Sequence, residues 1–176
     1  MRKIILNLAI SLDWYICTNK WKFDWIQGDG SKSNDTKKQF DFWRFLEDTD
    51  TIIMWKKAYL DCWIEDIEGY DRKKIYIASS KSFDTKYWNL EIINWDITKK
   101  ILNLKKEKWK NIWLFWWAWL TDEFIKDNIV DEYIIWIIPI LLWEGRRLFL
   151  WNNPLVKLKL VENTTQEWIV ILKYIK

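Results

Sequence analysis

Two pairs of polar residues stand directly after short apolar segments that have the composition of buried strands. Lys56 and Lys57 follow one such segment, and Ser79 and Ser80 follow the next. The carboxyl ends of parallel strands meet at one edge of a sheet, and ligands bind there. The ammonium and hydroxyl groups could therefore hold a phosphate by charge-assisted hydrogen bonds. Taken alone, a pair of this kind is more often two solvated lysines or a turn, and it is their order at successive strand ends that favours a binding site.

A third strand end offers a turn that could bind through its backbone. The residues after the strand expected at 111–115 are Trp116, Trp117, Ala118, Trp119 and Leu120. The chain should enter a helix at this point. If the turn were rich in glycine, the N–H groups at the helix N-terminus could approach a pyrophosphate closely.

Asp13 is the candidate catalytic residue, because it stands just beyond the first expected strand, 3–10. A carboxylate at the end of a strand could hydrogen-bond a substrate beside the neighbouring strand ends. An aspartate in this place is as often a turn residue. The sequence leaves both roles open.

The segments that must position these residues alternate between strand and helix patterns. Strands are expected at 3–10, 51–54, 74–78, 90–93, 111–115 and 130–138, and helices at 35–47, 56–62, 97–106 and 121–126. A final hairpin is expected from 155–163 and 167–174, with its turn at 163–166. The alternation predicts an α/β fold: a mainly parallel central sheet flanked by helices, with a C-terminal antiparallel hairpin. Without a linker or an internal repeat, we expect one domain over 1–176.

Composition excludes several classes of function. The chain has no histidine, which excludes histidine-based triads and the usual zinc sites, so no metal is expected. Cys17 and Cys62 are isolated, which favours a reducing cytoplasm. The net charge of +3 comes without a basic tract, so no nucleic-acid partner is expected. The apolar N-terminal run breaks at Asn7 and the run 133–143 is too short to span a bilayer, so no membrane partner is expected either.

Tryptophan is abnormally frequent and glycine abnormally rare. The chain has 17 Trp and 4 Gly, whereas average usage would give roughly 12 glycines. Trp116, Trp117 and Trp119 crowd one expected turn, and Trp88 and Trp109 stand at a turn and a helix end, where glycine is favoured.

Three interpretations of these tryptophans remain open. They could be ordinary aromatic residues, as Trp25 and Trp113 look to be from their surroundings. They could form an aromatic surface that stacks on bases or sugars. Alternatively, the gene could read UGA as glycine where this sequence reads it as tryptophan, and this hypothesis predicts Trp in place of Gly at turns.

Several short motifs follow one another in the order typical of one enzyme family. Residues 11–16 are similar to S-L-D-G-x-I, residues 53–59 to V-M-G-R-x-T-Y, residues 114–120 to a strand followed by G-G-A-G-L, and residues 139–149 to P-x-L-L-G-x-G-x-x-L-F, with D-E-Y at 131–133. The chain thus resembles the dihydrofolate reductase-like reductases, in particular the C-terminal reductase domain of riboflavin biosynthesis proteins. The mismatches are mostly Gly to Trp, at Trp14, Trp55, Trp116, Trp117, Trp119 and Trp143; Lys56 and Ala58 also depart from the family's Arg and Thr.

The resemblance implies an NADPH-dependent reductase that transfers hydride to a small heterocyclic substrate, pterin-like or pyrimidine-like. It implies that Lys56 and Lys57 with Ser79 and Ser80 recognise the adenosine 2′-phosphate, beside Trp55. It implies that residues 116–120 hold the pyrophosphate. The family often forms homodimers, and the apolar stretch 133–142 could supply the interface.

Two other classes of function stay open. Real indoles at positions 116 and 117 would fill the cofactor groove, and the protein would then be a catalytically inert homodimer with a binding or structural role. A binding protein with an aromatic surface would need a basic groove, which the sequence lacks.

Dihydrofolate reductase itself is disfavoured, because Asp41 is not securely placed as its pterin-binding carboxylate. The absence of a deaminase domain excludes a bifunctional riboflavin protein.

Overall fold

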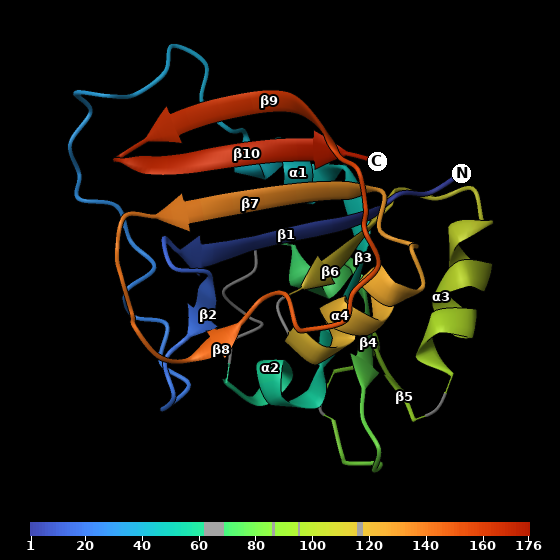
Figure 1. Ribbon diagram of the computed structural model, residues 1–176. Coiled ribbons are helices and arrows are strands. Elements are labelled where there is room, and N and C mark those ends of the chain that lie inside the picture. The colour runs from blue at the N-terminus through green and yellow to red at the C-terminus, as the bar shows by residue number, and fades with distance from the viewer. Residues whose placement is uncertain (62–68, 86, 95, 116–117) are drawn as a thin grey trace.

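A computed structural model of the chain describes residues 1–61, 69–85, 87–94, 96–115 and 118–176, which form a twisted sheet with helices on both faces (Figure 1). The strands of the main sheet are β1 (Ile4–Ser11), β3 (Thr49–Trp55), β4 (Lys74–Ala78), β5 (Leu90–Ile93), β6 (Asn111–Phe115), β7 (Glu132–Ile138), β9 (Lys159–Gln166) and β10 (Ile169–Ile175). A separate pair consists of β2 (Tyr15–Cys17) and β8 (Arg146–Arg147). The helices are α1 (Phe42–Glu47), α2 (Lys56–Asp61), α3 (Ile97–Lys105) and α4 (Ala118–Lys126), with a 3-10 turn, η2, at Tyr70–Arg72.

The order of strands confirms the predicted fold class. Across the sheet it runs β5-β4-β3-β6-β1-β7-β10-β9, with parallel pairing from β5 to β7 and antiparallel pairing of β10 with β7 and β9. The central strands are nearly continuous apolar runs, as expected for parallel strands covered on both faces. The predicted bounds of β4, β5 and β6 agree with the structure.

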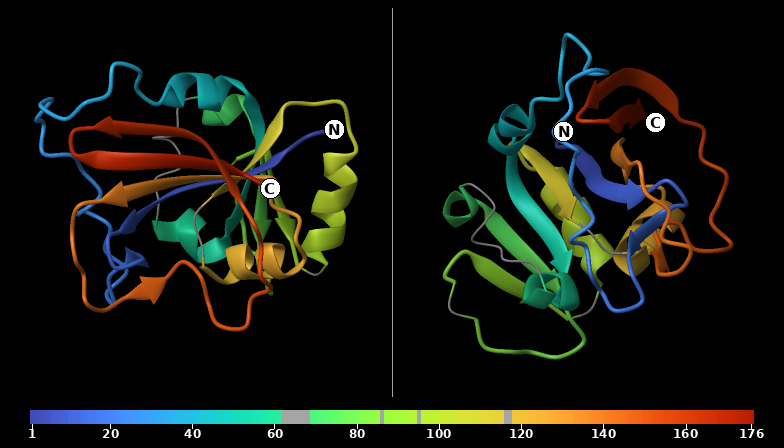
Figure 2. Two further views of the ribbon diagram at one scale, coloured as in Figure 1. Left: turned by 45° about the horizontal axis from the view of Figure 1, so that its top comes forward. Right: turned by 90° about the vertical axis from the view of Figure 1, so that its left-hand side faces the viewer.

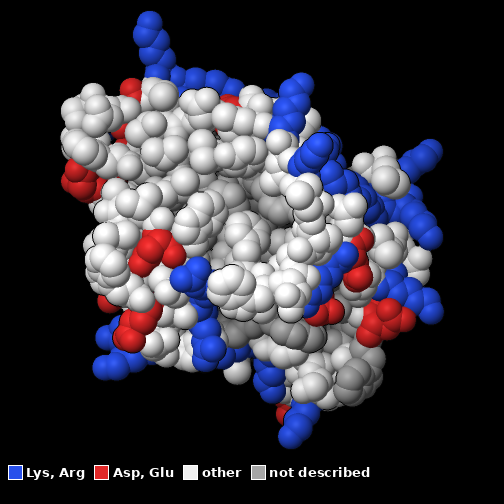
Figure 3. Space-filling view, viewed as in Figure 1, with Lys and Arg blue, Asp and Glu red and all other residues white. Residues whose placement is uncertain are grey.

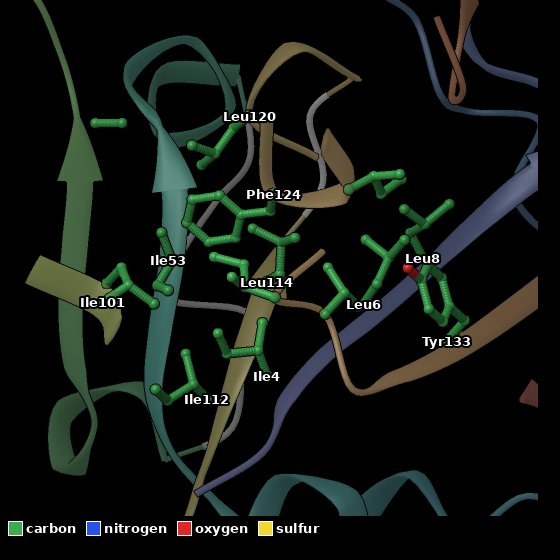
Figure 4. Close-up of a cluster of buried hydrophobic side chains, with 14 of the residues drawn as sticks. Ile4, Leu6, Leu8, Ile53, Ile101, Ile112, Leu114, Leu120, Phe124 and Tyr133 are labelled. Carbon is green, nitrogen blue, oxygen red and sulfur yellow. The ribbon is translucent and has the colours of Figure 1, made fainter. Parts of the chain in front are cut away.

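Helices α3 and α4 cover one face of the sheet. Leu120 and Phe124 of α4 are fully buried against Ile53 and Leu114, and Leu6 lies in the same cluster (Figure 4). This packing fixes the start of α4 directly beyond the end of β6. Burial of side chains of this size stabilises a fold by about 1.5–3 kcal/mol each.

Helices α1 and α2 cover the opposite face, as the two views of Figure 2 make clear for α1 and α4. Phe45 of α1 and Ala58 of α2 pack there against Ile52 and Trp113. The ring of Phe45 meets that of Trp113 edge to face, with centroids 5.2 Å apart. The sheet therefore carries a second, more aromatic core on the side of the 18–41 segment.

The first predicted helix was placed too early. It begins at Phe42 rather than near 35, because the carboxylate of Asp41 accepts a hydrogen bond from the Arg44 N–H and caps it. Asp35 instead accepts the backbone N–H of Glu167, 2.7 Å away, and holds the tip of the last hairpin. Asp41 is thus a helix cap.

The last hairpin is confirmed, but its turn lies at Glu167 and Trp168 and not at 163–166. The sequence pattern counted Trp168 as a strand residue facing the neighbouring strand, whereas its backbone φ is +65°. The short pair β2–β8 was not predicted, since strands of two or three residues leave no periodicity to detect.

Four of the ten residues in the stretch 133–142, for which a dimer interface was predicted, are buried within the chain itself. Its strand, β7, lies between β1 and β10, and Tyr133, Ile134, Ile135 and Ile138 are buried inside the chain's own sheet. The apolar run reflects a central parallel strand. Among the described residues, no helix is both long and apolar enough to cross a membrane.

Candidate functional site

The structure brings the first two predicted turns together at one edge of the sheet. Strands β3 and β4 are neighbours, with Trp55 paired to Ala78, so that Lys56 and Ser79 begin adjacent turns. Trp55 itself is half-buried against the core. Strand β6 lies on the other side of β3, and helix α4 begins soon after it, at Ala118. The third predicted turn therefore leads from the same edge.

Residues Trp116 and Trp117 lie outside the described residues, as does Cys62. Ala118 and Trp119 form the first turn of α4. Leu120 is fully buried, so its side chain anchors the helix to the core while its backbone stays in the N-terminal turn. An exposed helix N-terminus carries unpaired N–H groups and a partial positive charge, both suited to phosphate oxygens.

The two lysines at the start of α2 are oriented by aromatic rings. The Lys56 Nζ lies 4.5 Å from the centroid of Phe83, and the Lys57 Nζ lies 4.8 Å from that of Trp21. Lys57 also pairs with Asp61 one helical turn later, at 2.8 Å. Within the described part of the chain, Lys56 has no carboxylate partner of this kind.

The two serines after β4 differ in their exposure. Ser79 is buried, and its hydroxyl donates to the Lys81 carbonyl at 2.6 Å and accepts from the Lys81 N–H, so it stabilises its own turn. Ser80 is exposed. Of the pair, Ser80 is the residue available to a ligand.

Asp13 is brought against the loop that follows β7. Its carboxylate accepts from the Ser11 hydroxyl at 2.6 Å, from the Leu142 N–H at 3.1 Å and from the Trp143 N–H at 2.7 Å. Partial burial works to raise the pKa of Asp13, but these hydrogen bonds outweigh it, and the pKa lies below its ordinary value. The contacts favour the turn-residue interpretation, in which Asp13 joins two loops at the rim of the site.

A second connection continues the same rim. Strand β2 pairs with β8, and a Cβ on Gly145 would lie 2.1 Å from the Cys17 carbonyl oxygen, so the close approach requires glycine. Cys17 is buried, and burial raises the pKa of its thiol, which disfavours a nucleophilic role. Arg146 and Arg147 are exposed on β8, where Figure 3 shows basic side chains over the lower left of the face.

Asn7 is a buried polar residue that the sequence analysis did not select as a candidate. It is a buried amide in the middle of β1, paired to Phe115, the last residue of β6. Its Oδ1 accepts from the Trp136 indole at 2.8 Å and its carbonyl accepts from the Trp113 indole at 3.0 Å. Its Nδ2 is buried with no hydrogen-bond partner in the described part of the chain.

A buried donor without a partner costs free energy, so its retention calls for an explanation. The signal was visible in the sequence as a polar residue inside an apolar strand. It was interpreted there only as a break in an apolar run.

The fold and the site correspond to known proteins. A Shewanella sp. PV-4 protein assigned to riboflavin biosynthesis has a crystal structure that matches with a TM-score of 0.76 and 20% identity, over 99% of this chain and 98% of that one. Two Bacillus subtilis (strain 168) proteins, each called uncharacterized, are similar in sequence. YyaP is 32% identical over 93% of this chain and 89% of its own length, and YwjB is 29% identical over 90% of each.

The fold is therefore that of the dihydrofolate reductase-like proteins of riboflavin biosynthesis. The RibD C-terminal domain family matches residues 66–170. The chain belongs to this family, which confirms the resemblance drawn from its motifs.

Replacement of Asp13 by Asn should lower the free energy of unfolding by about 1–2 kcal/mol at neutral pH, because charge-assisted hydrogen bonds to the 142–143 loop are weakened. Since the pKa of Asp13 is lowered in the folded state, its contribution is present above the ordinary aspartate pKa and is lost as the pH falls through the lowered one. Urea denaturation at neutral and acid pH measures the effect.

The difference between the two proteins should shrink in acid. Asp84→Asn changes an exposed carboxylate and is the matched control, with little effect at either pH. A difference that stays constant or widens in acid would show that Asp13 does not act through its charge.

Proposed function

We propose that the protein is an NADPH-dependent reductase that transfers hydride to a small heterocyclic substrate, pterin-like or pyrimidine-like. The observation that carries the proposal is that the turns after the adjacent strands β4 and β3 and the start of helix α4, which follows β6, lie at one edge of the sheet. In open α/β sheets this edge is where nucleotides bind. Membership of a reductase family supports the same conclusion.

The residues present suit the phosphates of such a cofactor. Lys56 and Lys57 would bind the 2′-phosphate together with the exposed Ser80, while Ser79 keeps the turn in shape. The N-terminal turn of α4 would face the pyrophosphate. The bound cofactor supplies the hydride, so the protein has to bind, orient and exclude water.

Asn7 is the residue that we propose for substrate recognition. Its Oδ1 is held by Trp136, which fixes the amide and directs the Nδ2 as a donor. The rings of Phe40 and Phe42 lie 5.3 Å and 6.1 Å from Trp136 and give this face an aromatic character. A carbonyl or ring nitrogen of a flat heterocycle would satisfy the unpaired donor.

We further propose a cytoplasmic homodimer. The edge strand β9 carries the exposed residues Leu160 and Val161 and is a better candidate for the interface than 133–142. Size-exclusion chromatography would reveal the dimer.

NADPH titration followed by protein fluorescence tests the cofactor assignment. Two proteins should be compared: the chain as written, and one with glycine at 14, 55, 116, 117, 119 and 143. We expect the glycine protein to bind NADPH more tightly than NADH. Lys56→Ala in that protein should weaken NADPH binding about tenfold or more while NADH binding stays nearly unchanged, because only NADPH carries the 2′-phosphate.

Arg44→Ala, an exposed cation on α1, is the control and should leave both affinities unchanged. Failure of both proteins to bind NADPH would contradict the assignment and leave the inert homodimer as the better account of the chain.

Asn7→Ala in the glycine protein should raise KM for 5-amino-6-(5-phosphoribosylamino)uracil at least tenfold, with NADPH affinity nearly unchanged, because the unpaired donor is lost. NADPH oxidation at 340 nm is the conventional readout. Trp136→Phe removes the same Asn7–Trp136 hydrogen bond but keeps the Nδ2. Equal losses in the two variants would mean that Asn7 serves only the packing of the sheet.

A further inference from the structure

Four tryptophans have backbone conformations that L-residues with large side chains rarely adopt. Trp14, Trp21, Trp143 and Trp168 have φ values of +73°, +60°, +63° and +65°. The other described residues with positive φ, apart from glycine, are Asp96, Asn128, Asn152 and Glu167. Asn and Asp tolerate the left-handed region, whereas a bulky residue there is an outlier.

The hairpin between β9 and β10 shows the requirement most clearly. Gln166 pairs with Ile169, so Glu167 and Trp168 form a two-residue turn in which both φ values are positive, +48° and +65°. This is the signature of a type I′ turn, whose second central position is normally glycine. A two-residue Glu-Gly turn fits the geometry, and Glu-Trp does not.

The turn at Thr18 places the same requirement on Trp21. The Trp21 N–H donates to the Thr18 carbonyl at 2.9 Å, and the Thr18 N–H donates to the Lys22 carbonyl at 3.1 Å. A residue with positive φ follows the turn and lets the chain reverse direction. In tight turns of this kind glycine is the residue that takes the left-handed position.

Trp14 and Trp143 lie in the two loops that Asp13 joins. The Trp14 N–H closes a turn onto the Ser11 carbonyl at 3.0 Å, and the Trp143 N–H binds Asp13. Their side chains are 51% and 79% exposed, so little packing offsets the conformational cost. Trp168 is also exposed.

Other tryptophans in the chain have the opposite character. Trp25 and Trp113, which the sequence predicted to be ordinary aromatic residues, are buried, and Trp136 is half-buried. Their indole N–H groups donate to the Lys22 carbonyl, the Asn7 carbonyl and the Asn7 Oδ1. None of these three has a positive φ.

Trp88 and Trp109 are exposed without a positive φ, so the predicted demand for glycine at their backbones is not found. Trp55 is in a strand, and its glycine assignment rests on the family motif alone.

We propose that positions 14, 21, 143 and 168 are glycine in the protein that the gene encodes, and that glycine at 21 opens an anion-binding site between Lys57 and Arg146. Both cations contact the Trp21 ring: the Lys57 Nζ and the Arg146 guanidinium carbon each lie 4.8 Å from its centroid. Removal of the indole leaves two positive groups facing a common space. The ligand class is a phosphate or pyrophosphate group.

The arrangement of charges supports an anion there. Among the described residues, Lys57 pairs with the carboxylate of Asp61, whereas Arg146 is exposed on β8 and contacts the same ring. Two cations brought to one point repel each other unless a ring or an anion lies between them. An Arg–phosphate contact also gives two parallel hydrogen bonds, which lysine alone cannot offer.

The glycine positions are tested at the gene and then in the protein. We expect UGA codons at 14, 21, 143 and 168 and UGG codons at 25, 113 and 136. Replacement of the four tryptophans by glycine should raise Tm by roughly 2–4 °C for each relieved position. Trp43→Gly is the control, because Trp43 is exposed on helix α1, and it should lower Tm. UGG codons at the four positions, or a Tm that falls, would overturn this part of the proposal.

The anion site is tested with inorganic pyrophosphate by calorimetry on the four-glycine protein. Pyrophosphate binding should weaken about tenfold or more when Arg146→Ala is added to this protein. It should weaken about as much in the protein that carries the other three glycine substitutions but keeps Trp21. Arg44→Ala should have no effect. Equal affinity whichever residue stands at 21 would overturn the site.

The anion site rests on the proposed function only through Lys57, and the two can fail separately. If pyrophosphate binding requires Trp21→Gly and Arg146 but the protein does not bind NADPH, the anion site is supported and the cofactor assignment is contradicted. If the protein binds NADPH equally well with and without Arg146→Ala and does not bind pyrophosphate, the cofactor assignment is supported and the anion site is contradicted.

Discussion

The parallel pairing of β1 with both of its neighbours is the constraint on which the rest of the structure depends. Ile5–Ser11 runs beside β7, and Ile4–Asn7 runs beside β6. Because β1 is fixed on both sides, its middle places Asn7 beside the end of β6 and its end places Asp13 against the loop after β7. A one-residue slip would exchange the two faces of the strand and move Asn7 to the face of the sheet that Leu6 and Leu8 occupy.

The two edges of the sheet use their charges differently. At the edge where the parallel strands begin, Arg2 pairs with Asp50, Lys105 pairs with Asp131 at 2.6 Å, and Lys3 and Lys173 share the buried Glu132. These charges hold termini and loops together, and removing one partner of a buried pair is costly. At the opposite edge Lys56, Arg146 and Arg147 contact aromatic rings. Cations held by rings keep their charge available to an anion, so the second edge is the one suited to a cofactor.

Periodicity and apolar runs were sufficient to predict the main sheet, because parallel strands buried on both faces are hard to mistake. They failed where a single side chain decides a boundary. Asp41 caps α1, whereas Asp35 accepts a hydrogen bond from the turn of the last hairpin. Both are aspartates that precede the same helix, and only the tertiary contact of Asp35 distinguishes their roles. For the candidate site, the sequence correctly placed Lys56 and Ser80 on adjacent turns after β3 and β4. Asn7 was not selected, because a linear pattern does not show that its Oδ1 has a hydrogen-bond partner and that its Nδ2 has none among the described residues.

The backbone requirement and the motif mismatches are separate observations that agree at Trp14 and Trp143. The motif comparison selected these positions because a related sequence pattern has glycine there, without any knowledge of φ. The structure selects them because φ is positive, and it adds Trp21 and Trp168 by the same criterion. Three of the four, together with Gly145, belong to the loops joined by Asp13 and by the β2–β8 pair. The rim of the candidate site is therefore shaped by backbone that only glycine adopts without strain.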